Sequence, residues 1–124
     1  MADTETEKIV YLSTNGPENP EKASLPFVLA NAALVMDVEA LIVLQGPSVF
    51  LAKKGIIEHV HAAGFAPLKE LLESFLEQGG KLAVCVPCIQ ERKIDETDLI
   101  EKAEPMAGGT LTLELLSANA TLVY

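Results

Sequence analysis

Short apolar runs alternate with amphipathic segments along this chain of 124 residues. The runs are too short for ordinary helices and are rich in Val, Ile, Leu and Ala, which is typical of strands buried on both faces. They predict five strands, at residues 8–13, 40–44, 81–84, 103–106 and 120–124. Polar clusters that contain Gly and Pro follow the first two runs and favour turns there.

The segments between these strands carry helical signals. In residues 21–36 apolar side chains recur at three- and four-residue steps, which predicts an amphipathic helix. Those positions are Leu25, Val28, Leu29, Ala32 and Ala33. A clearer helix is predicted at residues 67–78, which begin at a proline and are followed by two glycines. Shorter helices are predicted at residues 49–54, with Ser48 as cap, at residues 87–92 and at residues 108–117.

This succession predicts one α/β domain over residues 8–124, preceded by a flexible tail at residues 1–7. The expected architecture has three layers and is flavodoxin-like, with a mainly parallel five-stranded sheet and helices on both faces. We take the flavodoxin-like strand order, 2-1-3-4-5, as the expected one. Ligands of such sheets bind beyond the carboxyl ends of the strands, where the strand order reverses. For this order the reversal lies between the first and third strands.

The two cysteines of the chain, Cys85 and Cys88, follow the third predicted strand. Pro87 suits the first turn of a helix, where its missing N–H would be unpaired anyway. The cysteines are therefore expected at a strand end and a helix N-terminus. Unpaired N–H groups and the helix dipole stabilise an anion there, and the thiolate anion is the reactive form of cysteine. Cys85 and Cys88 are thus the candidate catalytic residues, although a cysteine at a strand end is often only a small buried apolar residue.

The expected strand order brings a second loop to the cysteines, the one after the first strand. In that loop Thr14, Asn15 and Gly16 form either an ordinary turn with a helix cap or a contact to a substrate or anion. Arg92, one helical turn beyond Cys88, either stabilises a nearby anion or forms a surface ion pair. These four residues are the candidate substrate-binding set.

Composition and charge narrow the function classes. The chain is 49% hydrophobic, which excludes intrinsic disorder and predicts a homo-oligomer that hides apolar surface. The net charge of −9, from 18 acidic and 9 basic residues, argues against nucleic acid as a partner. The chain has no run of about 20 apolar residues, and its acidic, polar first residues are not expected to act as a signal peptide. We therefore expect a cytoplasmic protein that does not bind a membrane.

Neither a metal nor a cofactor is expected. A zinc site needs two good ligands besides the cysteines, and His59 and His61 would lie on different sides of a helix. The chain has no Trp, so it lacks a sign of flavin stacking. It also has no G-x-G-x-x-G motif, so it lacks a sign of a dinucleotide site. Two cysteines in a chain of this kind are expected to be reactive or metal-binding rather than a structural staple.

Three segments of the chain resemble the DsrE/DsrF-like family of small sulfur-relay proteins, including its TusD-like and YchN-like members. They are the opening KIVYLSTNGPENPEKASLPFVLANAAL, the cysteine segment VCVPCIQERKIDE and the closing GGTLTLELLSANATLVY. Their order and spacing together carry the resemblance, which extends over nearly the whole chain.

The resemblance implies a role for each cysteine. In the family the cysteine at the strand end carries sulfur as a persulfide, and this role falls on Cys85. YchN-like members also have the second cysteine, here Cys88. The resemblance further implies sulfur donor and acceptor proteins as partners, and a trimer or hexamer. The family commonly has Arg-Gly after the cysteine helix, whereas here Arg92 is followed by Lys93, which puts the turn geometry in question.

Four functions remain open, and whether the chain is an enzyme remains open with them. The first is a sulfurtransferase-like persulfide carrier, in which Cys85 accepts sulfur and Cys88 is auxiliary. The second is a thiol–disulfide redox protein, because C-x-x-C also suits that exchange. The third is a non-catalytic module that binds a nucleotide or flavin, and the fourth is an oligomeric scaffold with merely buried cysteines.

Overall fold

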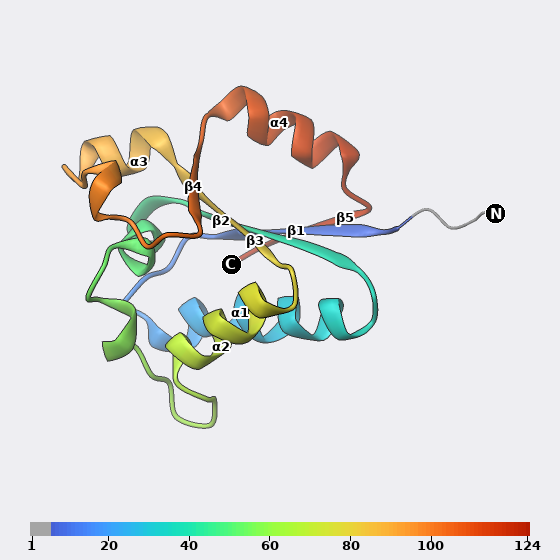
Figure 1. The fold of residues 1–124 in the computed structure, drawn as a ribbon, viewed down its shortest axis with the longest axis horizontal. Helices are drawn as coiled ribbons and strands as arrows, with labels where there is room; N and C mark the ends of the chain where they lie inside the picture. The colour runs from blue at the N-terminus through green and yellow to red at the C-terminus, as the bar shows by residue number, and fades with distance from the viewer. Residues whose placement is uncertain (1–5) are drawn as a thin grey trace.

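Five parallel strands form the middle layer of a three-layer α/β domain (Figure 1). The structure is a computed structural model that describes residues 6–124. Its strands are β1 Lys8–Ser13, β2 Glu39–Leu44, β3 Lys81–Cys85, β4 Ala103–Met106 and β5 Ala120–Val123. The predicted single α/β domain with a parallel five-stranded sheet is confirmed. Most of the tail predicted at residues 1–7 lies outside the described residues.

Helices cover both faces of the sheet, as predicted. Helices α1 and α2 lie on one face, and α3 and α4 lie on the other (Figure 1). Their bounds are α1 Pro20–Val35, α2 Leu68–Glu77, α3 Val86–Glu91 and α4 Gly108–Ser117. Three short 3-10 helices complete the fold: η1 Gly46–Ala52, η2 Ile57–His59 and η3 Glu96–Asp98. Over residues 6–124, no helix has both the length and the apolar character that a membrane crossing requires.

The strand order is β4-β3-β2-β1-β5, so the expected order 2-1-3-4-5 is wrong. In this order β2 separates β1 from β3, and Leu44 of β2 is paired with Ser13 on one side and Val84 on the other. The chain steps across the sheet in one direction from β1 to β4, and only α4 carries it back to place β5 beside β1. The order therefore reverses between β1 and β5, two strands away from the cysteines.

Helix α1 buries a different face from the one that its apolar spacing predicts. Its buried residues are mostly small: Ala23, Ser24, Pro26, Phe27, Ala30 and Ala33. Of the predicted stripe only Ala33 is buried, while Leu29 is 41% exposed. Small side chains let the helix backbone approach the sheet closely, so the alanine-rich face packs inward and the larger Leu29 points outward.

The segment after β2 also differs from the prediction of a helix at residues 49–54 capped by Ser48. The 3-10 helix η1 begins at Gly46, and its N-cap residue is Gln45. Gly46 has a φ of +56°, a left-handed conformation that favours glycine, so the chain turns directly after Gln45. Ser48 fixes this turn from inside, because its Oγ accepts the Gln45 N–H at 2.8 Å and donates to the Ser13 carbonyl at 2.5 Å.

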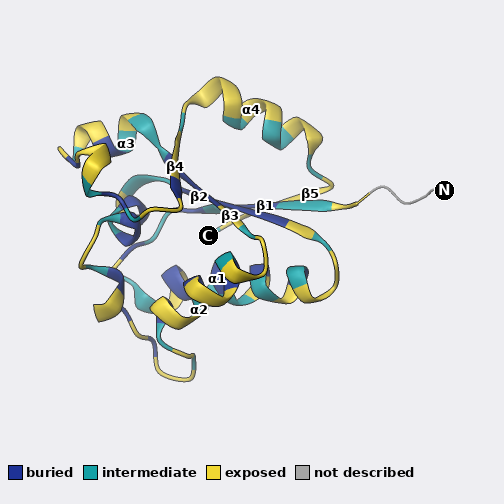
Figure 2. Ribbon diagram, in the orientation of Figure 1, coloured by how far each residue is buried: buried dark blue, intermediate teal, exposed yellow. Residues whose placement is uncertain are grey.

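The sheet divides the hydrophobic core into two unequal parts (Figure 2). The larger part includes the residues between the sheet and helices α1 and α2, where the rings of Phe27 and Phe75 meet edge to face with centroids 6.0 Å apart. The smaller part is centred on Val10, Leu41, Val43 and Ala83. Helix α4 packs against this smaller part with partly buried residues only. The α4 side of the sheet is thus the less tightly packed side.

Candidate functional site

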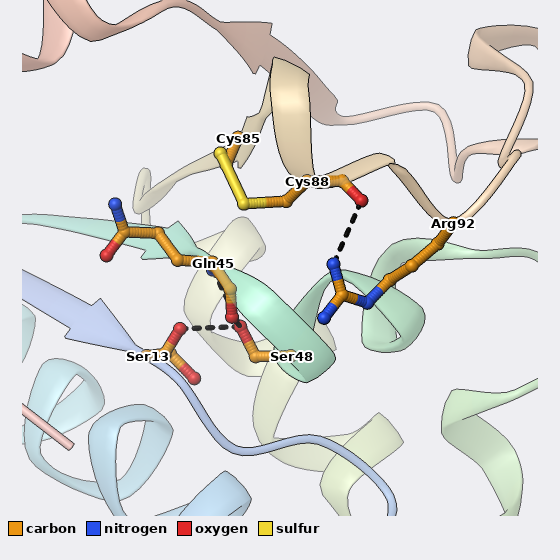
Figure 3. The surroundings of a disulfide bond; sticks show 6 residues. All are labelled: Ser13, Gln45, Ser48, Cys85, Cys88 and Arg92. Atoms are coloured by element: carbon orange, nitrogen blue, oxygen red, sulfur yellow. Dashed lines mark hydrogen bonds between the residues drawn. A yellow bond between two sulfur atoms is a disulfide. The ribbon is translucent and has the colours of Figure 1, made fainter. Parts of the chain in front are cut away.

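The cysteines lie at the carboxyl end of β3, as predicted. Cys85 is the last residue of β3 and the N-cap of α3, and Cys88 lies in the first turn of α3. Their Cα atoms are 5.2 Å apart and a disulfide joins their Sγ atoms (Figure 3). Both side chains are half-buried. This Cα separation lies within the range that disulfide bonds span.

Helix α3 begins as its proline predicts but is short. It starts at Val86, Pro87 lies in its first turn, and it ends at Glu91 after six residues. Few peptide dipoles are therefore aligned behind Cys85, so the helix alone is a weak source of stabilisation for a thiolate.

Arg92 contributes to the cysteine helix through the backbone. Arg92 is the C-cap of α3, and its guanidinium Nη1 donates a hydrogen bond of 3.2 Å to the carbonyl oxygen of Cys88 (Figure 3). Its half-buried side chain therefore folds back along the helix toward the cysteines. The contact holds the carbonyl of Cys88, although Arg92 follows Cys88 by about one helical turn along the chain.

The loop of Thr14, Asn15 and Gly16 does not face the cysteines, because β2 and the turn after it lie between them. Its polar groups also have partners within the chain. The Thr14 N–H donates to the Tyr124 carbonyl at 2.7 Å, and the Gly16 N–H donates to the two carboxylate oxygens of Glu18 at 3.0 and 3.1 Å. The predicted meeting of this loop with the cysteine loop is wrong, because it depended on the strand order.

The loop after β1 instead packs against the turn after β2. A Cβ atom built on Gly16 would lie 2.3 Å from the carbonyl oxygen of Pro47, so only glycine fits between the two segments. Because the turn after β2 in turn lies beside β3, Thr14, Asn15 and Gly16 reach the cysteines only through it.

Gln45 is a residue of this region that the sequence reasoning missed. It follows β2 directly, just as Cys85 follows Val84 on the neighbouring strand, and Leu44 and Val84 are paired. Figure 3 shows the Gln45 side chain among those surrounding the disulfide. The available signal was positional: both residues end an apolar run that predicts a strand. A lone glutamine belongs to no motif, and neighbouring strands could not be assigned without the strand order.

The described residues offer no alternative site built on a metal. Over residues 6–124, no group of three or more His, Cys, Asp or Glu side chains is placed to hold a metal ion. His59 and His61 are both exposed, and Nε2 of His61 lies 2.9 Å from the carbonyl oxygen of Phe65.

Comparison with known proteins identifies the family. Residues 7–124 match the DsrE/DsrF-like family. The chain belongs to this family. The resemblance noted in the sequence is thereby confirmed over nearly the whole chain.

Two similar proteins come from Methanocaldococcus jannaschii. The uncharacterized protein MJ0760 is 34% identical over 116 residues, which make up 94% of this chain and 42% of that protein. The uncharacterized protein MJ0989 is 32% identical over 97 residues, which make up 78% of this chain and 82% of that protein. The chain thus spans well under half the length of the first relative.

Solved structures share the fold. The ychN protein from E. coli superimposes with a TM-score of 0.81 at 21% sequence identity, covering 96% of this chain and 100% of the other. A protein of unknown function from Methanobacterium thermoautotrophicum, MTH1491, has a TM-score of 0.65 at 11% identity, covering 97% and 100%. At these identities the comparison shows the fold alone.

Proposed function

We propose that this protein is a sulfur-relay protein that accepts sulfur as a persulfide on Cys85 and passes it to a partner protein. One observation carries the proposal: the two cysteines of a DsrE/DsrF-like chain lie together at the carboxyl end of β3, half-buried and within disulfide reach. A partly exposed cysteine at a strand end is accessible to a second protein. Family membership supports a sulfur-relay role in general.

The loading step is a thiol exchange. The Cys85 thiolate attacks the outer sulfur of a donor persulfide, a new S–S bond forms on Cys85, and the donor leaves as a thiolate. In the transfer step an acceptor thiolate attacks that outer sulfur, and Cys85 leaves as a thiolate again. Each step exchanges one S–S bond for another, so no external oxidant or cofactor is required.

Cys88 provides a second route by which the sulfur can be released from Cys85. Its thiolate attacks the Sγ of the Cys85 persulfide, the Cys85–Cys88 disulfide forms, and the outer sulfur leaves as hydrosulfide. The Cα separation of 5.2 Å supports this step because it lies within the range that disulfides span. A thiol reductant must then reopen the disulfide before another cycle begins.

The remaining site residues have supporting roles in this proposal. Arg92 donates a hydrogen bond to the Cys88 carbonyl and so helps to hold the cysteine helix in place. Thr14, Asn15 and Gly16 lie beyond the turn that follows β2, at the same edge of the sheet. We propose that they contact the donor or acceptor protein rather than the sulfur atom.

We further propose that the protein acts in the cytoplasm as a homo-oligomer, a trimer or a hexamer. The support is exposed apolar surface, which a soluble chain of this size would hide in contacts with other copies. The large apolar residues that are most exposed are Leu29, Val35, Met36, Leu113, Leu116, Leu122 and Val123. Light scattering on the purified protein tests this, and a monomer at micromolar concentration would overturn it.

The function is tested by sulfur loading. The reduced protein and its Cys85→Ser and Cys88→Ser variants are incubated with a persulfide donor, and intact mass is measured without reductant. We expect Cys88→Ser to gain one sulfur atom and Cys85→Ser to gain none. If Cys88→Ser gains none and Cys85→Ser gains one, the roles are reversed. If no form gains sulfur from any persulfide donor, the relay function fails.

The disulfide favours one second candidate, a thiol–disulfide redox protein. Such a protein would exchange electrons with a partner dithiol through Cys85 and Cys88 and carry no sulfur. Its distinguishing result is reduction of a disulfide substrate by the dithiol form, together with no mass gain from a persulfide donor. Both cysteines would then be essential, whereas the relay proposal requires only Cys85 for loading.

A further inference from the structure

Cys85 has two neighbours in the row of residues that runs across the strand ends. On β4 it is paired with Met106. On the other side the register pairs Leu44 with Val84, so the next row brings Gln45 beside Cys85. Both residues are still in extended conformation, with φ of −131° for Gln45 and −62° for Cys85, so alternation along the strands places their side chains on the same face of the sheet.

The backbone holds Gln45 in this place. Its N–H donates to the Ser13 carbonyl at 2.9 Å, which continues the ladder between β2 and β1 by one residue. The same N–H lies 2.8 Å from the Ser48 Oγ, and the Ser48 N–H donates to the Gln45 carbonyl at 3.2 Å. The side-chain amide of Gln45 donates no hydrogen bond to the other residues drawn in Figure 3. The backbone of Gln45 is thus fixed, while its side-chain N–H groups have no partner among those residues.

Few of the groups around Cys85 can stabilise a sulfur anion on it. Its neighbour on β4, Met106, offers only a thioether, and Arg92 at the end of α3 is engaged with the Cys88 carbonyl. Helix α3 has six residues and aligns few dipoles. A sulfur anion on Cys85 is therefore expected to depend on a neutral donor close by, and a side chain with three rotatable bonds can turn toward it.

We propose that Gln45 is a further residue of the reactive site, whose carboxamide donates a hydrogen bond to the sulfur anion on Cys85. The bond forms to the thiolate and, after loading, to the outer sulfur of the persulfide; this second part rests on the proposed function.

The test uses Cys88→Ser as the parent protein, because Cys85 is then the only thiol and no disulfide can form. The variants are Gln45→Leu, which removes the donors, and Gln45→Glu, which replaces them with a negative charge. Both keep the backbone hydrogen bonds of residue 45. Gln90→Leu is the matched control, because Gln90 is exposed on the same short helix as Cys88. The rate of alkylation is measured against pH for each protein, and circular dichroism checks the fold.

We expect Gln45→Leu to raise the pKa of Cys85 by about one unit, which makes alkylation below that pKa about tenfold slower. Gln45→Glu should raise the pKa further, since a carboxylate repels a thiolate. Gln90→Leu should coincide with the parent. Coincidence of all four pH profiles would overturn the proposal, whatever the sulfur uptake. A shifted profile for both Gln45 variants, with no sulfur uptake by the parent, would support Gln45 as donor to the thiolate and refute the relay function instead.

Discussion

Helices α2 and α4 have the same length, ten residues, yet they pack in opposite ways. Helix α2 buries Leu68, Leu72 and Phe75 against the sheet. Helix α4 buries no residue, and two of its leucines, Leu113 and Leu116, are 68% and 77% exposed. The leucines and the phenylalanine of α2 fall on one side of the helix, whereas the leucines of α4 are spread around the helix.

Polar contacts help to hold α4 against the sheet. The Lys8 ammonium forms an ion pair with Glu114 at 2.6 Å and donates to the Ser117 hydroxyl at 2.7 Å, which ties α4 to β1. A hollow of about 580 Å³ remains beside this contact, with Leu41, Ala83 and Met106 among the residues that line it. Met106 is also the neighbour of Cys85 across the strands. The difference indicates that apolar burial is concentrated between the sheet and helices α1 and α2, in the larger core against which Cys85 and Cys88 also pack.

The largest expected effect is a loss of stability on the face of the sheet that α1 and α2 cover. Phe75→Ala should lower the free energy of unfolding by about 3–5 kcal/mol, because it removes a fully buried ring that meets Phe27. Leu113→Ala on α4 should change it by no more than about 0.5 kcal/mol in dilute protein. Urea unfolding of both variants measures the contrast, with Phe75→Leu as a milder change if the alanine variant does not fold. Equal losses at the two positions would contradict the comparison.

A second prediction tests whether the exposed face of α4 forms the contact between copies of this chain. If copies of this chain cover that face, the double change Leu113→Glu and Leu116→Glu should dissociate the oligomer, because burying two carboxylates in an apolar contact is costly. Light scattering measures the mass. Thr112→Glu, an added charge at another exposed position of the same helix, is the control. An oligomer that survives the double change would place the contact elsewhere on the molecule.

The smallest expected effect is pH-dependent and concerns Tyr11, which faces α1. Burial, with a smaller contribution from Tyr124, raises the pKa of Tyr11 above its ordinary value of 10.0. The folded state then keeps the phenol proton to higher pH than the unfolded state, so the stability that this proton gives is present below pH 10.0 and is lost above it.

The variant Tyr11→Phe isolates this contribution. At pH 7 it should cost no more than about 1 kcal/mol, since the hydroxyl makes one long bond of 3.3 Å to the Leu29 carbonyl. Above pH 10.0 the variant should lose less stability than the wild type. Unfolding free energies measured across this range check the prediction, and parallel curves for the two proteins would contradict it.

Local pattern was sufficient for most elements of the fold. The bounds of β1, β4 and α4 agree with the sequence-based expectation at both ends. Each of these elements is delimited by residues that act locally, such as the glycines that open α4. The position of the cysteines at the end of β3 could be predicted for the same reason.

Features that depend on packing between distant segments could not be predicted in this way. The apolar runs of β1, β2 and β3 are alike in composition, so nothing in them specifies that β2 separates the other two. The buried face of α1 depends on how closely alanines let it approach the sheet, which apolar spacing does not encode. Because Gln45 becomes a neighbour of Cys85 only once the strand order is known, it was missed.

The most direct test of the central claim follows sulfur on the cysteine peptide over time. Reduced wild type and Cys88→Ser are loaded with a persulfide donor, and the peptide that carries Cys85 is analysed by mass spectrometry while released sulfide is measured. We predict that Cys88→Ser keeps one extra sulfur atom on Cys85, whereas the wild type releases sulfide as the Cys85–Cys88 disulfide forms. The extra sulfur found on Cys88, or on neither cysteine in either protein, would contradict the account.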